Sequence, residues 1–128
     1  MHLNIDCARD ILLTVESKPY GEDMRINKLC EALPSYSEDE ISYACLKLKE
    51  GGYLEAVITH SISVPAPIVV AIRELTFSGH QFLDNIRDSQ NWDKTKEIGK
   101  KAGSVGLNML AKIAEGVITT YLKTQFGI

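Results

Sequence analysis

Four polar side chains between positions 42 and 49 have the types and the spacing to contact a nucleic acid. They are two hydroxyl and two ammonium groups, on Ser42, Tyr43, Lys47 and Lys49. Hydroxyl groups hydrogen-bond to base edges or phosphates, and ammonium groups pair with phosphate oxygens. Because Tyr43 and Lys47 are four residues apart, a helix would place them on one face. The pattern predicts a DNA-contacting patch on that helix.

Two further cations, Arg25 and Lys28, precede this segment and could contact backbone phosphates. A solvated surface is the other interpretation of the two side chains. With them, the candidate DNA-binding set is Arg25, Lys28, Ser42, Tyr43, Lys47 and Lys49.

The distribution of charge argues against DNA. The same segment begins with three acids, Glu38-Asp39-Glu40, and residues 61–67 contain no Lys or Arg. The net charge is −3, with +3 on residues 93–128 and −6 on the residues before them. Carboxylates repel phosphates, so any DNA contact would depend on local patches.

Two interpretations of function follow. The first is a DNA-binding protein of regulatory type that contacts double-stranded DNA through residues 37–50. The alternative is a protein-interaction adaptor or phage-associated inhibitor that binds no DNA. The hydrophobic loop 61–67 and the C-terminal helix would then be its contact surfaces.

Catalytic and metal-binding chemistry has no support in the sequence. The three histidines, at positions 2, 60 and 80, show no metal-ligand spacing with each other or with the cysteines. There is also no nucleophile elbow and no glycine-rich phosphate loop after a strand. We therefore expect a protein that is not an enzyme and has no metal and no cofactor. Cys7, Cys30 and Cys45 are odd in number and far apart, which favours small buried thiols over disulfides.

The elements that position these residues follow from hydrophobic periodicity and end signals. The clearest signal is Ser37-Glu38-Asp39-Glu40, a capping box that opens a helix ending at Gly51-Gly52. Thr76 is expected to cap the helix that follows the second strand. Helices are predicted over residues 4–17, 24–33, 38–50, 77–87, 92–101 and 105–124, and strands over 53–58 and 68–75.

Two motifs flank the predicted hairpin. The first is Leu46-x-Leu48-x-x-Gly51-Gly52-Tyr53-Leu54, at the end of one helix and the start of the first strand. The second is Leu75-Thr76-x-x-Gly79-His80-x-Phe82-Leu83, the entry into the helix after the hairpin. Together they resemble winged helix-turn-helix proteins, in which the first motif ends the recognition helix and the second follows the wing. With the opening Asn4-x-Asp6-x-x-Arg9-Asp10-Ile11-Leu12-Leu13 and the Trp92 helix, the chain resembles a family of small uncharacterised bacterial and prophage proteins, described by a domain of unknown function. The resemblance implies a winged-helix fold and almost nothing about function.

The expected architecture is mainly α with a small β-hairpin: a winged helix-turn-helix core over residues 1–88 and a C-terminal helical extension over 89–128. A chain of 128 residues can bury a core of its own. There is no apolar run long enough to cross a bilayer, and the N-terminus is charged, so we expect a cytoplasmic protein with no membrane contact. The apolar C-terminal helix either completes the chain's own core or forms a homodimer.

Overall fold

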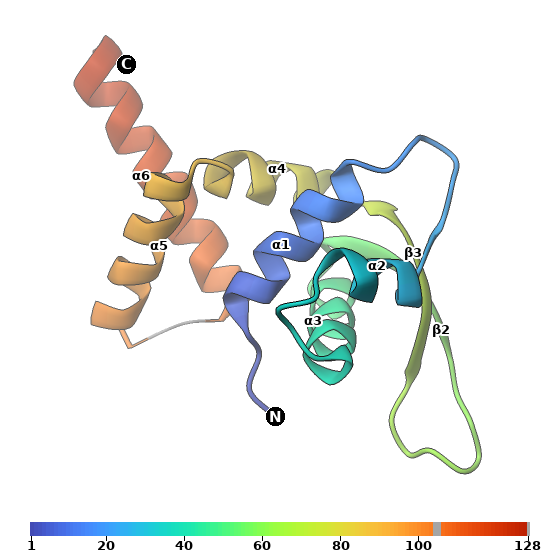
Figure 1. Ribbon diagram of the computed structural model, residues 1–128. Helices are drawn as coiled ribbons and strands as arrows, with labels where there is room; N and C mark the ends of the chain where they lie inside the picture. Colours follow the sequence, from blue (N-terminus) through green and yellow to red (C-terminus); the bar gives the residue numbers. More distant parts are fainter. Residues whose placement is uncertain (104–105, 128) are drawn as a thin grey trace. The chain divides into compact units, whose positions relative to one another are not determined.

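The computed structural model describes residues 1–103 and 106–127 and is mainly helical, with a small antiparallel sheet (Figure 1). This confirms the predicted class, mainly α with a small β-hairpin. The chain divides into two compact units, Met1–His80 and Gln81–Ile128, and the division falls within one helix. Val105, where the last helix was predicted to begin, lies outside the described residues.

The first unit contains three complete helices and the sheet. Its elements are α1 (Ile5–Glu16), β1 (Met24–Arg25), α2 (Ile26–Ala32), α3 (Glu38–Glu50), β2 (Leu54–Thr59), β3 (Ile68–Leu75) and the start of α4 (Phe77–Ile86). The second unit contains the rest of α4 with α5 (Ser89–Lys101) and α6 (Leu107–Phe126).

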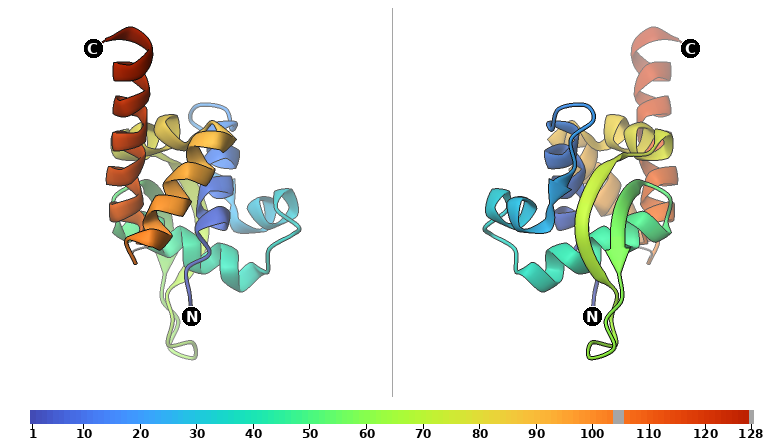
Figure 2. Two further views of the ribbon diagram at one scale, coloured as in Figure 1. Left: turned by 90° about the vertical axis from the view of Figure 1, so that its left-hand side faces the viewer. Right: turned by 90° about the vertical axis from the view of Figure 1, so that its right-hand side faces the viewer.

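The sheet has the strand order β1-β3-β2 and is antiparallel throughout. The β2–β3 hairpin runs in register from Leu54 opposite Leu75 to Thr59 opposite Ile68, with two irregularities between. Its loop extends away from the helices of the first unit (Figure 2). The strand β1 was not predicted. Met24 pairs with Ile72, so the helix predicted from Met24 begins two residues later, at Ile26.

The core of the first unit forms where α1 packs on α3 and β3. The periodic apolar residues of α1 and α3 are buried, as their spacing predicts. They are Cys7, Ala8, Ile11, Leu12 and Val15 on α1, and Ile41, Ala44, Cys45 and Leu48 on α3. The three cysteines are free thiols; Cys7 and Cys45 are fully buried, whereas Cys30 is half-buried.

The predicted capping box is confirmed at the start of α3. The Glu40 amide donates to Ser37 Oγ and the Ser37 amide donates to Glu40 Oε1, each at a distance of 3.1 Å. At the other end of α3, Gly52 adopts a φ of +83°, the left-handed conformation that glycine tolerates best. The helix α3 therefore has both of its ends fixed locally.

Thr76 joins the end of α3 to the start of α4. Its hydroxyl accepts a hydrogen bond from the Gly79 amide at 3.0 Å, as predicted for an N-cap. The same hydroxyl donates to the Gly52 carbonyl. The next residue of the motif, Gly79, lies so close to the Tyr53 carbonyl that an added Cβ would overlap it. The glycine is thus required by packing and not by its own backbone angles.

In the second unit, α5 packs along α6. The helix α5 begins at Ser89 and not at Trp92 as predicted. The Asp88 carboxylate accepts from the Gln90 and Asn91 amides over 2.9 and 3.1 Å, so the polar residues form a capped first turn. The buried face of α6 consists of Leu107, Leu110, Ala114 and Val117.

Candidate functional site

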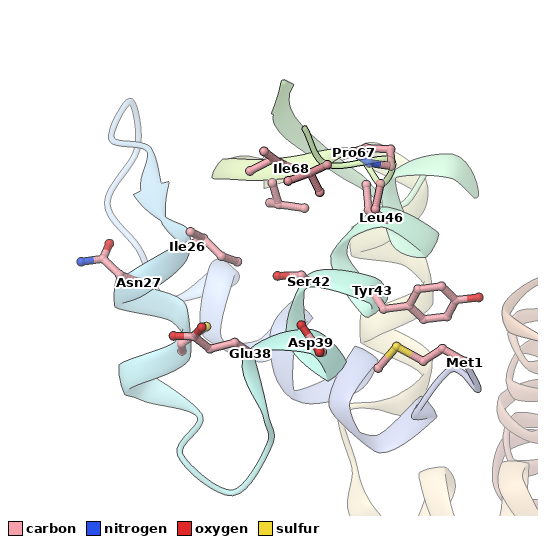
Figure 3. Close-up of a pocket in the computed structure, with 14 residues that line it drawn as sticks. Met1, Ile26, Asn27, Glu38, Asp39, Ser42, Tyr43, Leu46, Pro67 and Ile68 are labelled. Carbon is pink, nitrogen blue, oxygen red and sulfur yellow. The ribbon is translucent and has the colours of Figure 1, made fainter. Parts of the chain in front are cut away.

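A groove of about 440 Å³ opens in the first unit between α2, α3 and the β2–β3 hairpin. Figure 3 shows its walls: Ile26 on one side, Ser42 and Leu46 on α3, and Pro67 with Ile68 at the hairpin. The lining residues are Met1, Ile26, Asn27, Cys30, Glu38, Asp39, Ser42, Tyr43, Leu46, Val64, Ala66, Pro67, Ile68 and Val69.

The walls of the groove are mainly apolar. Val64 and Ile68 are 44% and 37% exposed, and Leu46 and Ile26 are half-buried. Leu46 points toward Pro67, and Ser42 points into the space that faces Ile26 (Figure 3). Apolar side chains that remain accessible on three different segments give a concave surface of the kind that binds apolar groups.

One rim of the groove is acidic. Glu38 and Asp39 lie in the first turn of α3, where the positive end of the helix dipole favours carboxylates. Both side chains are exposed. Of the described residues that line the groove, none is Lys or Arg. The groove therefore combines apolar walls with negative charge.

The structure brings two of the six predicted contact residues into this groove, Ser42 and Tyr43, both half-buried. Lys49 is exposed and lines a separate shallow hollow with Arg73. Arg25 is exposed at the N-cap of α2. The six residues thus do not form a single lining.

Two of the predicted phosphate-contacting cations are engaged within their own helices. Lys47 donates to Glu50 over 2.8 Å and lies 5.2 Å from the centre of the Tyr43 ring. The hydrogen bond to Glu50 raises the pKa of Lys47 above its usual value. Lys28 lies 3.6 Å from Glu31. An approaching phosphate would compete with these carboxylates for both ammonium groups.

Several groove residues were missed in the sequence because they lie on segments with no shared periodicity. They are Met1, Ile26, Asn27, Cys30, Leu46, Ile68 and Val69. A partial signal existed in the hydrophobic loop 61–67, whose residues Val64, Ala66 and Pro67 line the groove. The loop was predicted as a contact surface, but its neighbours on α2 and α3 were not.

The cysteine thiol in the groove is the most accessible of the three. Burial and, secondarily, the nearby Glu38 carboxylate raise the pKa of Cys30. Burial raises the pKa of both Cys7 and Cys45 to about 12.

Within residues 1–103 and 106–127, no group of three or more His, Cys, Asp or Glu side chains is arranged to hold a metal ion. No helix in the same ranges is long and apolar enough to cross a membrane.

Comparison with known proteins places the chain in a family. An uncharacterized protein of Haemophilus influenzae is 29% identical over 123 residues, which cover 95% of this chain and 99% of that protein. No solved structure matches. The family model described as "Hypothetical protein (DUF2513)" matches residues 2–105. The chain therefore belongs to the DUF2513 family.

Proposed function

We propose that this protein is a winged-helix interaction module that binds a segment of a partner protein in the groove between α2, α3 and the β2–β3 hairpin. The partner segment carries apolar side chains flanked by Lys or Arg. The observation that carries the proposal is the combination, in one groove, of accessible apolar walls with the acidic rim of Glu38 and Asp39.

The winged-helix assignment is supported by the order of elements in the first unit. Three helices are followed by a two-stranded hairpin and a further helix, and α3 occupies the place of the recognition helix. Both sequence motifs of the resemblance have structural roles, since Thr76 caps α4 and Gly79 lies against Tyr53. The fold alone does not specify what is bound.

Electrostatics favour a basic partner over a phosphate backbone. The first unit, residues 1–80, contains seven Lys and Arg against twelve Asp and Glu, a net charge of −5. In a helix-turn-helix complex the N-terminal residues of the recognition helix face the base edges. Here those residues are Glu38 and Asp39, whose carboxylates repel the phosphates of a duplex and attract Lys or Arg.

We propose a cytoplasmic location for the same protein. Cys7, Cys30 and Cys45 are all free thiols, the usual state of cysteines in a reducing compartment. We assign no catalytic residue and no cofactor.

A peptide selection tests the proposal. A phage-displayed library of random peptides is selected on the full chain alone, and each retained peptide is then tested against the variant Ser42→Arg, which places a long cation inside the groove and should weaken binding. We expect retained peptides that combine apolar residues with Lys or Arg and that bind the variant Ile62→Arg as well as the wild type. Ile62 is fully exposed and is not a lining residue, so it is the matched control. Peptides that bind wild type and Ser42→Arg equally would contradict the proposal.

Double-stranded DNA is the second candidate partner. It is favoured by the position of α3 after α2 and before the hairpin, and by the exposed cations Arg25 and Lys49. Fluorescence anisotropy with a mixed-sequence duplex at about 50 and 200 mM salt tests it, because phosphate contacts weaken steeply over that range. A steep loss of binding with salt would support DNA, and no binding at the lower salt would exclude it.

A further inference from the structure

One face of α6 is exposed along the last two-thirds of the helix. Spacings of three and four residues place seven residues on this face, opposite the buried one. They are Lys112, Glu115, Gly116, Thr119, Leu122, Lys123 and Phe126, and all seven are exposed. Phe126 is 65% and Leu122 37% accessible. We call this set the α6 stripe.

The α6 stripe is complementary to itself when two copies run antiparallel. With a twofold axis at Thr119, each residue before Thr119 lies opposite the residue equally far after it on the second copy. Glu115 then faces Lys123, Gly116 faces Leu122, and Lys112 faces Phe126. Each pairing joins partners of matching chemistry: a carboxylate with an ammonium group, a hole with a knob, and a cation or its aliphatic stem with an aromatic ring.

From this complementarity we infer that the protein forms a homodimer through an antiparallel pairing of α6 helices, with Thr119 at the twofold axis. Every residue of the α6 stripe has a partner in this register, and each ion pair occurs twice, as an isologous interface requires. The paired length from Lys112 to Phe126 is about 21 Å at the rise of an α-helix.

The surroundings of Gly116 fit the same arrangement. An added Cβ at Gly116 would meet nothing within 4 Å, so the surface there is open. A hollow of about 300 Å³ between α5 and α6 lies beside it, lined by Lys94, Ile98, Ile113, Gly116, Val117 and Thr120. In the proposed register, Leu122 of the second copy lies opposite Gly116 and can enter this hollow.

The charges of the α6 stripe are available for a second copy. Within the described residues, Glu115 and Lys123 have no ion pair in their own chain.

The buried face of α6 is already covered, so the helix contributes to its own unit and to the dimer with two different faces. Figure 1 shows that the last turns of α6 extend beyond α5. Neither the α6 stripe nor the hollow belongs to the groove of the first unit, so this inference is independent of the proposed function.

Sedimentation equilibrium of the full chain with a charge-swap series tests the dimer. Glu115→Lys or Lys123→Glu alone brings like charges together twice per dimer, and we expect each to raise the dissociation constant roughly tenfold or more. The double variant Glu115→Lys/Lys123→Glu restores opposite pairs, so its dissociation constant should return to the wild-type value. Lys100→Glu, on the exposed surface of α5, is the control and should leave it unchanged.

Circular dichroism of every variant checks that helix content is preserved. A wild type that is monomeric at all concentrations would overturn the inference. A double variant that dissociates as readily as the single variants would overturn the antiparallel register.

Discussion

The Asn4 side-chain amide donates a 3.0 Å hydrogen bond to Oε2 of Glu40, thirty-six residues further along the chain. Asn4 Oδ1 also accepts from the Cys7 amide at the start of α1, and Glu40 Oε1 accepts from the Ser37 amide at the start of α3. The N-terminal caps of the two helices are therefore linked. This linkage fixes α3, which forms one wall of the groove, against the helix behind it.

The Asn4–Glu40 bond predicts a pH-dependent contribution to stability. Hydrogen bonds from Asn4 and then from Ser37 lower the pKa of Glu40 below its ordinary value of 4.5. A carboxyl group whose pKa is lower in the folded state than in the unfolded state stabilises the protein at pH values above its unfolded-state pKa. This contribution is lost as the pH falls through its folded-state pKa. Glu40→Gln should thus be less stable than wild type at neutral pH, with the difference shrinking below pH 4.5.

Urea denaturation from neutral to acidic pH measures this difference. The matched control is the double variant Asn4→Ala/Glu40→Gln. It contains neither partner of the hydrogen bond, so the pH-dependent contribution of that bond to stability should be absent. A constant difference between wild type and Glu40→Gln across the titration would show that the bond does not persist in solution.

Gly79 is expected to tolerate no side chain. The Cβ of Gly79→Ala would overlap the Tyr53 carbonyl, so α4 or the start of the hairpin must shift. We expect a loss of about 3 kcal/mol in the free energy of unfolding, at the upper end of overpacking effects. Ser78→Ala, an exposed neighbour on the same helix, should change stability by less than about 0.5 kcal/mol. Equal stabilities of the two variants in chemical denaturation would refute the close approach.

The three thiols should differ in alkylation rate. Burial holds the pKa of Cys7 and of Cys45 at about 12, whereas Cys30 is half-buried in the groove. Mass spectrometry after iodoacetamide treatment at pH 8 should find Cys30 modified first, and all three modified only after denaturation. A selected peptide bound in the groove should slow the modification of Cys30. Unchanged modification at saturating peptide would place the peptide elsewhere.

Lys47→Glu separates the two candidate partners. Lys47 is not a lining residue of the groove, so the variant should bind a selected peptide as tightly as wild type does. If α3 binds DNA, the same variant should bind duplex DNA more weakly than wild type does, since the substitution replaces a phosphate-contacting cation with a carboxylate. Anisotropy titrations of peptide and duplex against both proteins measure this. Loss of peptide binding in a folded Lys47→Glu variant would contradict the groove.

Much of the fold was predictable because its signals are local. The residues Ser37 and Glu40 lie within one turn, and their reciprocal hydrogen bonds follow from residue type and spacing. Thr76 is another local signal, whose hydroxyl caps α4 as expected. Asp88 carried the same kind of signal, but the polar residues after it resembled a loop, so the first turn of α5 was missed.

The groove was less predictable because it depends on tertiary placement. Helical spacing identified Ser42 and Tyr43 as non-core positions of α3, but it cannot say that Ile26 and Ile68 face them across a cavity. The strand β1 was missed for a similar reason. A strand of two residues is too short to show a periodic pattern in the sequence. Met24 is extended only because β3 provides a partner for its backbone. By contrast, Lys47 and Glu50 lie three residues apart on one helix, a spacing at which sequence can indicate an ion pair.

The measurement that tests the central claim most directly compares wild type and Ser42→Arg for binding to a selected basic, apolar peptide and to mixed-sequence duplex DNA. Both titrations use fluorescence anisotropy at about 50 mM salt, where phosphate contacts are strong. The groove account predicts that wild type binds the peptide and not the duplex, and that Ser42→Arg loses the peptide. Duplex binding by wild type that becomes tighter in Ser42→Arg, with peptide binding unchanged, would contradict it.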